Sequence, residues 1–375
     1  MTETIVLKFG GTSLRDEEAR QAAVAHVQRH VRAGRSLAVV VSAMGRKGEP
    51  YATDSLIGLM RAAGAPVPAR ELDLAMSVGE TLSAAYFSHL LTLNGVPAQA
   101  FTGPQAGVLT DEKPGHAEIL EIRPERLQRS MRSGNVAVVA GFQGADVEGE
   151  IRTLGRGGSD TSAVALGAAL GASEVEIYTD VDGIACADPR RLPRAPFLER
   201  IGAAQILAMA EEGSKVLHPR AVTASLPSQT PIRVRNTFSE RPGTLVHHRD
   251  ASGPISPVAL AHRSELVRLS FSAEREPREL VPELLPIGGD SYLILEDVYL
   301  EQRLAKLEQQ YGAAKKEPGW GTVSVILSHA DAEEPPPSVS SHGEKIASVP
   351  GRWRYAVRAE HLDALLEELF ERFLL

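Results

Sequence analysis

The feature that most constrains the fold is a repeated order of elements: an apolar run, a turn, and then a helix-forming stretch. Thr4–Phe9 leads into the turn Gly10-Gly11-Thr12-Ser13 and a helix expected to end near Arg32. Leu37–Val41 then leads through a polar, glycine-bearing loop into a helix that begins near Thr53. Strand, loop and helix in this order are typical of βαβ units, so the sequence predicts an α/β fold with a parallel sheet.

Further strands of the same sheet are expected at Ala98–Thr102, Val136–Ala140, Val175–Tyr178 and Pro231–Arg235. In such folds the ligand crevice lies where the strands end, and the turns after Val136–Ala140 and Val175–Tyr178 are suited to line it. One of these turns contains Asp180 and Asp182, which could hold Mg²⁺ or could form an Asx-turn. Between the strands, Arg70–Leu91 is expected to form a long helix that is interrupted at Ser77–Thr81.

The stretch Leu154–Ala172 contains the most suggestive loop, Gly-Arg-Gly-Gly-Ser-Asp, followed by small helix-forming residues. Its glycines allow a tight bend and a close approach to a ligand, and Ser159 and Asp160 are both good helix N-cap residues. A helix N-terminus attracts anions, and Arg156 suits a carboxylate or a phosphate. Because Asp160 adds a carboxylate there, the loop suits a zwitterionic or metal-bound ligand better than a plain phosphate.

Composition restricts the protein class. The chain of 375 residues is long enough for two domains, and its net charge of −8 argues against nucleic-acid binding. One cysteine, Cys186, excludes an intrachain disulfide and is expected to be a small buried residue. No apolar stretch is long enough to span a membrane, and the first residues lack the features of a signal peptide. We therefore expect a soluble, cytoplasmic protein.

A change in composition near residues 250–257, rich in Ser, Gly and Pro, indicates a linker between a domain at 1–250 and a region at 258–375. The second region is expected to be α+β. Its strands are predicted at Leu266–Phe271, Tyr292–Leu295, Thr322–Leu327 and Trp353–Arg358, and its helices at Arg278–Leu285, Val298–Gln310 and Ala359–Phe373. The proline-rich segment 331–341 is predicted to be a loop.

These residues together favour phosphoryl transfer. Glycine turns, the lysines Lys8 and Lys215, Arg156 and several aspartates suit phosphates and Mg²⁺, and such catalysis depends mainly on positioning and charge neutralisation. The P-loop, protein-kinase and GxSxG motifs are all absent from the sequence. His26 and His30 lie four residues apart without metal-site spacing, so we expect them on a solvated helix face.

Eight collinear motifs resemble those of the aspartokinases, especially the diaminopimelate-sensitive type of spore-forming Gram-positive bacteria. They are KFGGTS from Lys8, VVSAMGRKGEPYATDSL from Val40, SVGET from Ser77, FTGPQAGVLT from Phe101, VAGFQG from Val139, TLGRGGSDTSAVALGAAL from Thr153, YTDVDGIACADPR from Tyr178 and GSKVLHPRAV from Gly213. The resemblance extends from Met1 to about His248. It implies the amino-acid kinase fold, an αβα sandwich around a mainly parallel sheet, and the conversion of ATP and L-aspartate into ADP and 4-phospho-L-aspartate.

The resemblance also implies roles for individual residues. The expected catalytic residues are Lys8, which would stabilise the transferring phosphoryl group, and Asp160. The expected substrate-binding residues are Thr53, Glu80 for the amino group, Arg156 for a carboxylate, and Gly157, Gly158 and Ser159 beside it. The expected ATP-binding residues are Lys8, Gly10, Gly11, Ser13, Thr179, Asp180, Asp182, Arg190 and Lys215. ATP and Mg²⁺ are the expected cofactors, and no direct metal ligand is assigned.

The region 258–375 resembles the family's ACT domains only at its two ends, Val258–Phe271 and Trp353–Leu375. We therefore predict shortened or degenerate ACT modules, divided as 258–315 and 320–375. The ACT-like remnant implies a homodimer, and the partial match leaves open whether an amino-acid effector binds. The implied product feeds lysine, diaminopimelate, threonine and methionine synthesis. Two alternatives remain at this point: another amino-acid kinase, such as one acting on glutamate, and a non-catalytic regulatory subunit that retains the fold.

Overall fold

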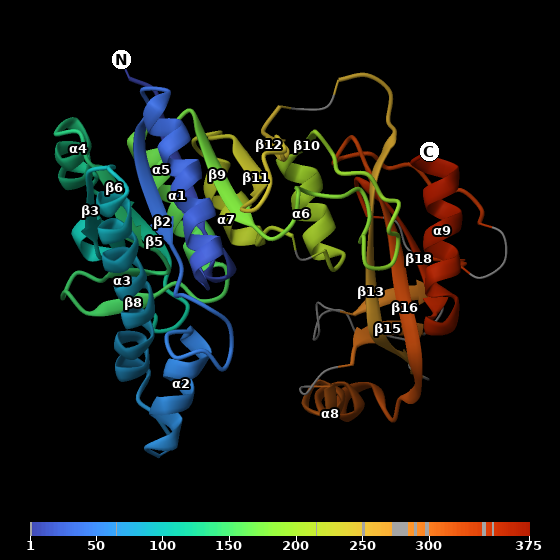
Figure 1. Cartoon of the computed structure of the whole chain (residues 1–375). Coiled ribbons are helices and arrows are strands. Elements are labelled where there is room, and N and C mark those ends of the chain that lie inside the picture. Colours follow the sequence, from blue (N-terminus) through green and yellow to red (C-terminus); the bar gives the residue numbers. More distant parts are fainter. Residues whose placement is uncertain are drawn as a thin grey trace. The chain divides into compact units, whose positions relative to one another are not determined.

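The computed structural model describes residues 2–64, 66–214, 216–249, 252–271, 284–288, 291–296, 300–339, 343–346 and 349–375. The chain forms two compact units, which are coloured along the sequence in Figure 1. The first comprises Met1–Ile184, Phe197–Ala203 and Leu217–His248, and the second comprises Ala185–Pro196, Ala204–Val216 and Arg249–Leu375. The chain therefore passes between the units more than once before residue 250.

An eight-stranded sheet forms the centre of the first unit, in the order β10-β12-β11-β9-β1-β2-β6-β3. All neighbouring pairs are parallel except β11 with β12, which are antiparallel. This mainly parallel sheet is the one that the glycine-turn pattern predicted. Its strands are β1 (Thr4–Phe9), β2 (Ser36–Val41), β3 (Ala98–Phe101), β6 (Val136–Ala140), β9 (Glu174–Thr179), β10 (Arg200–Gly202), β11 (Ile232–Asn236) and β12 (Thr244–His247).

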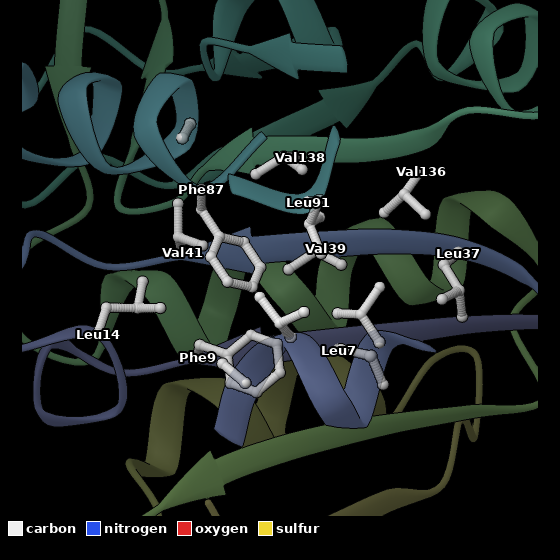
Figure 2. Packing of buried hydrophobic residues seen from close by; sticks show 14 of the residues in the cluster. Leu7, Phe9, Leu14, Leu37, Val39, Val41, Phe87, Leu91, Val136 and Val138 are labelled. Atoms are coloured by element: carbon white, nitrogen blue, oxygen red, sulfur yellow. The ribbon is translucent and has the colours of Figure 1, made fainter. Parts of the chain in front are cut away.

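Helices cover both faces of this sheet, as the expected αβα sandwich requires. Helices α1 (Glu17–Arg32) and α3 (Ala69–Leu93) pack on one face against alternate strand residues such as Leu7, Phe9 and Val39, and Figure 2 shows this core. Helix α5 (Gly158–Leu170) covers the opposite face with α7 (Pro219–Ser225) beside it. Because successive side chains of a strand point to opposite faces of the sheet, each strand contributes residues to the helix–sheet interface on both sides.

The remaining elements of the first unit lie around the sheet. A small four-stranded sheet has the order β5-β4-β7-β8. Its strands are β4 (Val108–Thr110), β5 (Ile119–Ile122), β7 (Gln143–Ala145) and β8 (Ile151–Thr153). The other helices are α2 (Thr53–Ala62) and α4 (Glu125–Arg132), with the 3₁₀ turns η1 (Gly11–Leu14) and η2 (Pro104–Ala106).

Two sequence-based expectations about the helices of this unit are wrong. Helix α3 is continuous through Ser77–Thr81, because Gly79 packs against Ala43 and the Tyr51 carbonyl without leaving helical geometry. The second error concerns His26 and His30, which are buried rather than solvated. They share the face of α1 that also buries Ala23 and Val27. That face follows the 3.6-residue period, so the histidines belong to the packed side of the helix.

The second unit contains a six-stranded antiparallel sheet in the order β14-β15-β13-β16-β18-β17. Its strands are β13 (Pro257–Ser270), β14 (Leu285–Gly288), β15 (Ser291–Leu295), β16 (Lys315–Leu327), β17 (Gly343–Lys345) and β18 (Arg352–Arg358). Its helices are α6 (Ala203–Glu211), α8 (Leu300–Tyr311) and α9 (Leu362–Phe373), with η4 (Ala359–His361) before α9. Leu304 and Leu307 of helix α8 share a core with residues of β13 and with Ile294 of β15.

Three further expectations concern this region. Of the helix predicted at Arg278–Leu285, residues 278–283 lie outside the described residues, and Leu285 begins β14, so its predicted helical end is wrong. In the proline-rich segment the described residues 331–339 form no helix or strand, which confirms the predicted loop there. Cys186 is buried, as expected, and burial raises the pKa of its thiol to about 11. None of the described helices is both long and apolar enough to cross a membrane.

A buried ionic cluster fixes the end of α6 within the second unit. The Glu212 side chain is 0% exposed, and its Oε1 accepts hydrogen bonds from Arg354 Nε at 2.8 Å and Arg352 Nη1 at 2.9 Å. Its Oε2 accepts from Ser324 Oγ at 2.8 Å. Burial by itself would raise the pKa of Glu212, but the charge of Arg354 and these hydrogen bonds outweigh it and lower the pKa.

Glu212→Gln should therefore destabilise the second unit by about 3 kcal/mol, because it leaves two arginines near a site that no longer carries the compensating charge. The measurement is urea unfolding followed by tryptophan fluorescence, since both tryptophans of the chain, Trp320 and Trp353, are buried in this unit. The matched control is Glu211→Gln, whose carboxylate is 61% exposed and whose ion pair with Arg352 should contribute less than about 1 kcal/mol. Equal midpoints for the two variants would contradict the assignment of Glu212 as the anchor of α6.

Candidate active site

The two residues expected to be catalytic meet in an ion pair. Lys8 Nζ of β1 lies 2.6 Å from Asp160 Oδ1 in the first turn of α5, and the two side chains are only 11% and 19% exposed. β1 is a central strand of the sheet and α5 packs on it, so residues from distant motifs converge at the end of β1. A largely buried pair of this kind is screened less by salt than a surface pair.

The glycine loop before α5 turns the chain directly into that helix. Gly157, not Ser159 or Asp160, is the N-cap, so the expectation from cap preferences is wrong. The reason is its backbone, which has φ of 75°, a left-handed value that glycine adopts without strain. Gly158 and the buried Ser159 form the first turn beside Asp160, whose charge is favourable at a helix N-terminus. Arg156 is exposed, and among the described residues no partner binds its guanidinium.

Glu80 on α3 is a buried carboxylate with one unused oxygen. Its Oε1 accepts a hydrogen bond from the Ala43 backbone N–H at 3.1 Å, whereas Oε2 is buried and has no hydrogen-bond partner among the described residues. Burial raises the pKa of Glu80 to about 8, against the smaller opposing effect of the backbone hydrogen bonds. An orphaned buried carboxylate oxygen is costly unless a ligand donates to it, so Glu80 is suited to an ammonium group.

The loop after β2 joins Glu80 to the first glycine turn. The Gly11 carbonyl accepts the Gly45 N–H at 3.1 Å, and a side chain on Gly11 would come within 2.7 Å of the carbonyls of Ala43 and Gly45. Only glycine therefore fits there. Thr53 begins α2, and the preceding Tyr51 carbonyl lies against Gly79, next to Glu80. The structure thus brings the segments of Gly11, Glu80 and Thr53 together.

Of the expected nucleotide-binding residues, Thr179 is the last residue of β9, and Asp180 and Asp182 follow it; we call this segment the nucleotide edge. Asp180 pairs with Arg46 at 2.8 Å. Asp182 accepts from Asn236 at 2.8 Å and pairs with Arg241 at 3.1 Å. Both carboxylates thus have cationic partners that a charged ligand could replace or join.

Thr237, directly after β11, connects this edge to the first glycine turn. Its Oγ1 lies 2.7 Å from Ser13 Oγ and 3.1 Å from the Thr179 carbonyl, to which it donates. Ser13 also donates to the Tyr178 carbonyl at 3.4 Å, and its side chain is buried. The buried His26 contacts the Thr237 carbonyl at 2.8 Å through Nε2. Ser13 therefore links the first glycine turn to the ends of β9 and β11, a role that the motif alone did not reveal.

Two expected residues are not placed with this group. Arg190 lies in the second unit, where it is exposed and pairs with Asp188 at 2.7 Å. Lys215 lies outside the described residues. Within the described part of the chain, no cluster of three or more His, Cys, Asp or Glu side chains could hold a metal ion on its own.

Sequence reasoning missed three residues around the glycine loop. Phe142 has φ of 68°, which strains a bulky residue, and its ring packs on Gly158. Asp73 on α3 is 1% exposed and accepts hydrogen bonds from Gly115 N and from Thr153. His218, the N-cap of α7, packs on Gly157. The sequence offered one signal for His218, its place in the motif GSKVLHPRAV. The contacts of Phe142, Asp73 and His218 depend on tertiary packing, so local sequence does not predict them.

Comparison with known proteins agrees with this arrangement. Residues 3–236 match the model of the amino acid kinase family. Aspartokinase 1 of Bacillus subtilis is 48% identical over 251 residues, which cover 66% of this chain and 62% of that protein. An aspartate kinase structure from Synechocystis is 31% identical with a TM-score of 0.59, covering 99% of this chain and 69% of that one. Escherichia coli aspartokinase III has the same fold, with 24% identity, a TM-score of 0.77 and full coverage of both chains.

The chain spans about three fifths of the length of the curated relatives that it matches. The expected fold class is confirmed: an amino-acid kinase sandwich followed by an antiparallel region consistent with an ACT-like fold. The expected family rests on the match over residues 3–236, which include the ion pair of Lys8 and Asp160. The chain therefore belongs to the amino acid kinase family and, within it, groups with the aspartokinases.

Proposed function

We propose that this protein is an aspartate kinase, which uses Mg²⁺-ATP to phosphorylate the side-chain carboxylate of L-aspartate and forms 4-phospho-L-aspartate. The observation that carries the proposal is the ion pair of Lys8 with Asp160, at 2.6 Å and largely buried, at the end of β1. A non-catalytic subunit has no physical need for a desolvated charge pair beside the glycine loop. The similarity to aspartokinases favours the same assignment.

The chemistry needs charge neutralisation more than a base. The attacking group is a carboxylate with a reference pKa of ~3.9, so it is ionised at neutral pH without help. The difficulty is to bring this anion toward a polyphosphate. Lys8 supplies a positive charge at the end of β1, and Asp160 holds its ammonium group in place. Fixed charges of this kind stabilise the charge that develops on the transferring phosphoryl group.

Recognition of the amino-acid substrate uses opposite charges on two elements. Glu80 Oε2 is buried without a partner among the described residues and suits the α-ammonium group. Arg156 is exposed on its loop and suits the α-carboxylate, for which a planar guanidinium is well shaped. We propose that Thr53, Gly157, Gly158 and Ser159 complete this pocket.

ATP is proposed to bind at the nucleotide edge and the first glycine turn, with Gly10 and Gly11 contributing. Mg²⁺ fits this edge because it commonly binds through substrate phosphates and one or two carboxylates, and Asp180 and Asp182 provide hard oxygen ligands. When bound, the ion would neutralise phosphate charge. We further propose a cytoplasmic homodimer that serves lysine, diaminopimelate, threonine and methionine synthesis.

Hydroxylamine trapping tests the proposed reaction, because it converts an acyl phosphate into a stable hydroxamate. The purified chain with Mg²⁺-ATP should form aspartyl hydroxamate from L-aspartate and at least ~100-fold less product from L-glutamate, in line with the discrimination that an added methylene allows. Equal products from the two amino acids would indicate a different amino-acid kinase. The absence of hydroxamate from both would contradict the proposal.

The role of Thr237 gives a separate prediction for nucleotide binding. Thr237→Val removes the hydroxyl that joins Ser13 to Thr179, so KM for ATP should rise by about tenfold, since each lost hydrogen bond contributes about 1 kcal/mol. KM for aspartate should stay within about twofold. Thr237→Ser keeps the hydroxyl and is the control that should behave like the wild type. Steady-state kinetics in which Thr237→Val leaves KM for ATP unchanged would refute this role.

A further inference from the structure

The loop that carries Arg156 is contacted from outside by the first turn of α7. This loop connects β8 to α5 and contains two glycines, Gly155 and Gly157, which have φ of 74° and 75°. Such a loop has many alternative conformations in the absence of contacts, because glycine restricts the backbone least. A flexible loop would lose entropy whenever Arg156 engaged a ligand, which weakens binding.

His218 packs directly on one side of the loop. A side chain built on Gly157 would lie 2.2 Å from Cγ and 2.6 Å from Cβ of His218, so the imidazole occupies the space beside the Gly157 backbone. The ring is oriented by its Nδ1, which accepts the Arg220 backbone N–H at 3.3 Å as the N-cap of α7. The ring therefore limits where the residue after Arg156 can move.

Arg220, two residues further on, binds the backbone before Arg156. Its guanidinium donates through Nη1 to the Leu154 carbonyl and through Nη2 to the Ala117 carbonyl, the latter at 2.9 Å. Both acceptors are main-chain carbonyl oxygens, so these hydrogen bonds fix the position of the backbone and do not depend on the side chains at these positions. The first turn of α7 thus holds the loop at Leu154 and at Gly157, on either side of Arg156.

The strand residue directly before the loop, Thr153, is held by a buried carboxylate. Asp73 accepts from Thr153 N at 3.1 Å, from Thr153 Oγ1 at 2.6 Å and from Gly115 N at 3.0 Å. The Gly115 carbonyl in turn lies where a side chain on Gly155 would be. With Asp73 holding this end, the contacts of α7 are the ones that decide the position of the residues around Arg156.

We propose that His218 and Arg220 are positioning residues that hold the Arg156 loop in the conformation that receives the substrate α-carboxylate. This inference rests on the proposed function and assigns a role to two residues that the catalytic motif set leaves unused. Both act through Arg156 and neither is a catalytic residue. The expected consequence is selective: loss of either contact weakens binding of the amino acid and leaves the nucleotide edge, on a different loop, unaffected.

The test for His218 uses a substitution that keeps the helix cap. His218→Asn retains a side-chain acceptor for the Arg220 N–H, since Asn is a good N-cap, but removes the ring that packs on Gly157. KM for aspartate should rise about tenfold, while KM for ATP and the melting temperature stay close to those of the wild type. Thr223→Ala, at an exposed position of the same helix, is the control and should change neither KM.

The test for Arg220 compares Arg220→Met with Arg220→Lys. Met removes both hydrogen bonds and should raise KM for aspartate about tenfold or more, whereas Lys restores one donor and should recover part of the loss. Equal increases in KM for aspartate and ATP, or unchanged KM values for His218→Asn and Arg220→Met, would overturn the proposal. A wild-type chain that forms no aspartyl hydroxamate would instead overturn the proposed function, so the two failures are distinguishable.

Discussion

Asp160→Ala should lower kcat for aspartate phosphorylation by about a thousandfold or more and leave the fold intact. Asp160 Oδ1 is the charge partner of Lys8 at 2.6 Å, and without it the ammonium group has no fixed position at the end of β1. Removing one preorganised hydrogen-bond donor from an acyl-transfer site typically costs about 10²–10³ in kcat, and this substitution affects two charges at once. Steady-state kinetics with the hydroxamate assay measure the loss.

The control for Asp160 is Glu125→Ala, which removes an exposed carboxylate from the first turn of another helix, α4. It should have nearly wild-type kcat and KM values. Circular dichroism of Asp160→Ala should match the wild type, because its side chain caps no backbone group among the described residues. A kcat for Asp160→Ala within tenfold of the wild type would show that the ion pair is not part of the catalytic machinery.

Glu80→Gln should raise KM for aspartate by about a hundredfold at pH 8 and abolish its pH dependence. In the free protein, burial raises the pKa of Glu80 to about 8, so the carboxyl group is mostly protonated at pH 6. Only the ionised form can pair with the substrate ammonium group, and such a charge-assisted bond contributes about 1.5–3 kcal/mol. KM of the wild type should therefore fall between pH 6 and pH 8, whereas KM of Glu80→Gln should stay flat.

The raised pKa of Glu80 also affects the stability of the ligand-free protein, in the direction opposite to its effect on aspartate binding: a rise in pH lowers the stability. Because the folded-state pKa of about 8 lies above the ordinary glutamate pKa of 4.5, the folded protein binds more protons than the unfolded chain between these values. Its stability should thus fall as pH rises through this window. Glu80→Gln lacks this loss and should melt above the wild type at pH 8. A wild-type KM that is independent of pH, or a variant that melts below the wild type at pH 8, would contradict the assignment.

Much of the first unit could be predicted from local sequence. Short apolar runs such as Leu37–Val41 are buried on both faces of a parallel sheet, so they read as continuous apolar segments that end in glycine turns. The convergence of Lys8 and Asp160 followed from collinear motifs. The position of His26 and His30 was also readable from the 3.6-residue period of α1, but the polar character of histidine favoured the wrong interpretation.

Other features could not be predicted, because they depend on contacts between distant segments. The hydroxyl of Ser13 binds Thr237, 224 residues away, and no local pattern indicates this partner. The contact between His218 and Gly157 arises only when α7 packs beside α5. The continuity of α3 at Gly79 depends on the close approach of Ala43, which makes a small residue necessary at a position where isolated propensity favours a break.

The most direct test of the central claim follows the γ-phosphate of ATP by ³¹P NMR in the presence of L-aspartate and Mg²⁺. The account predicts that the purified chain converts the γ-phosphate signal into an acyl-phosphate signal that hydroxylamine removes, and that Asp160→Ala forms none over the same period. ATP consumption without an acyl-phosphate signal, or an equal signal from Asp160→Ala, would contradict the claim that Lys8 and Asp160 form the centre of an aspartate kinase.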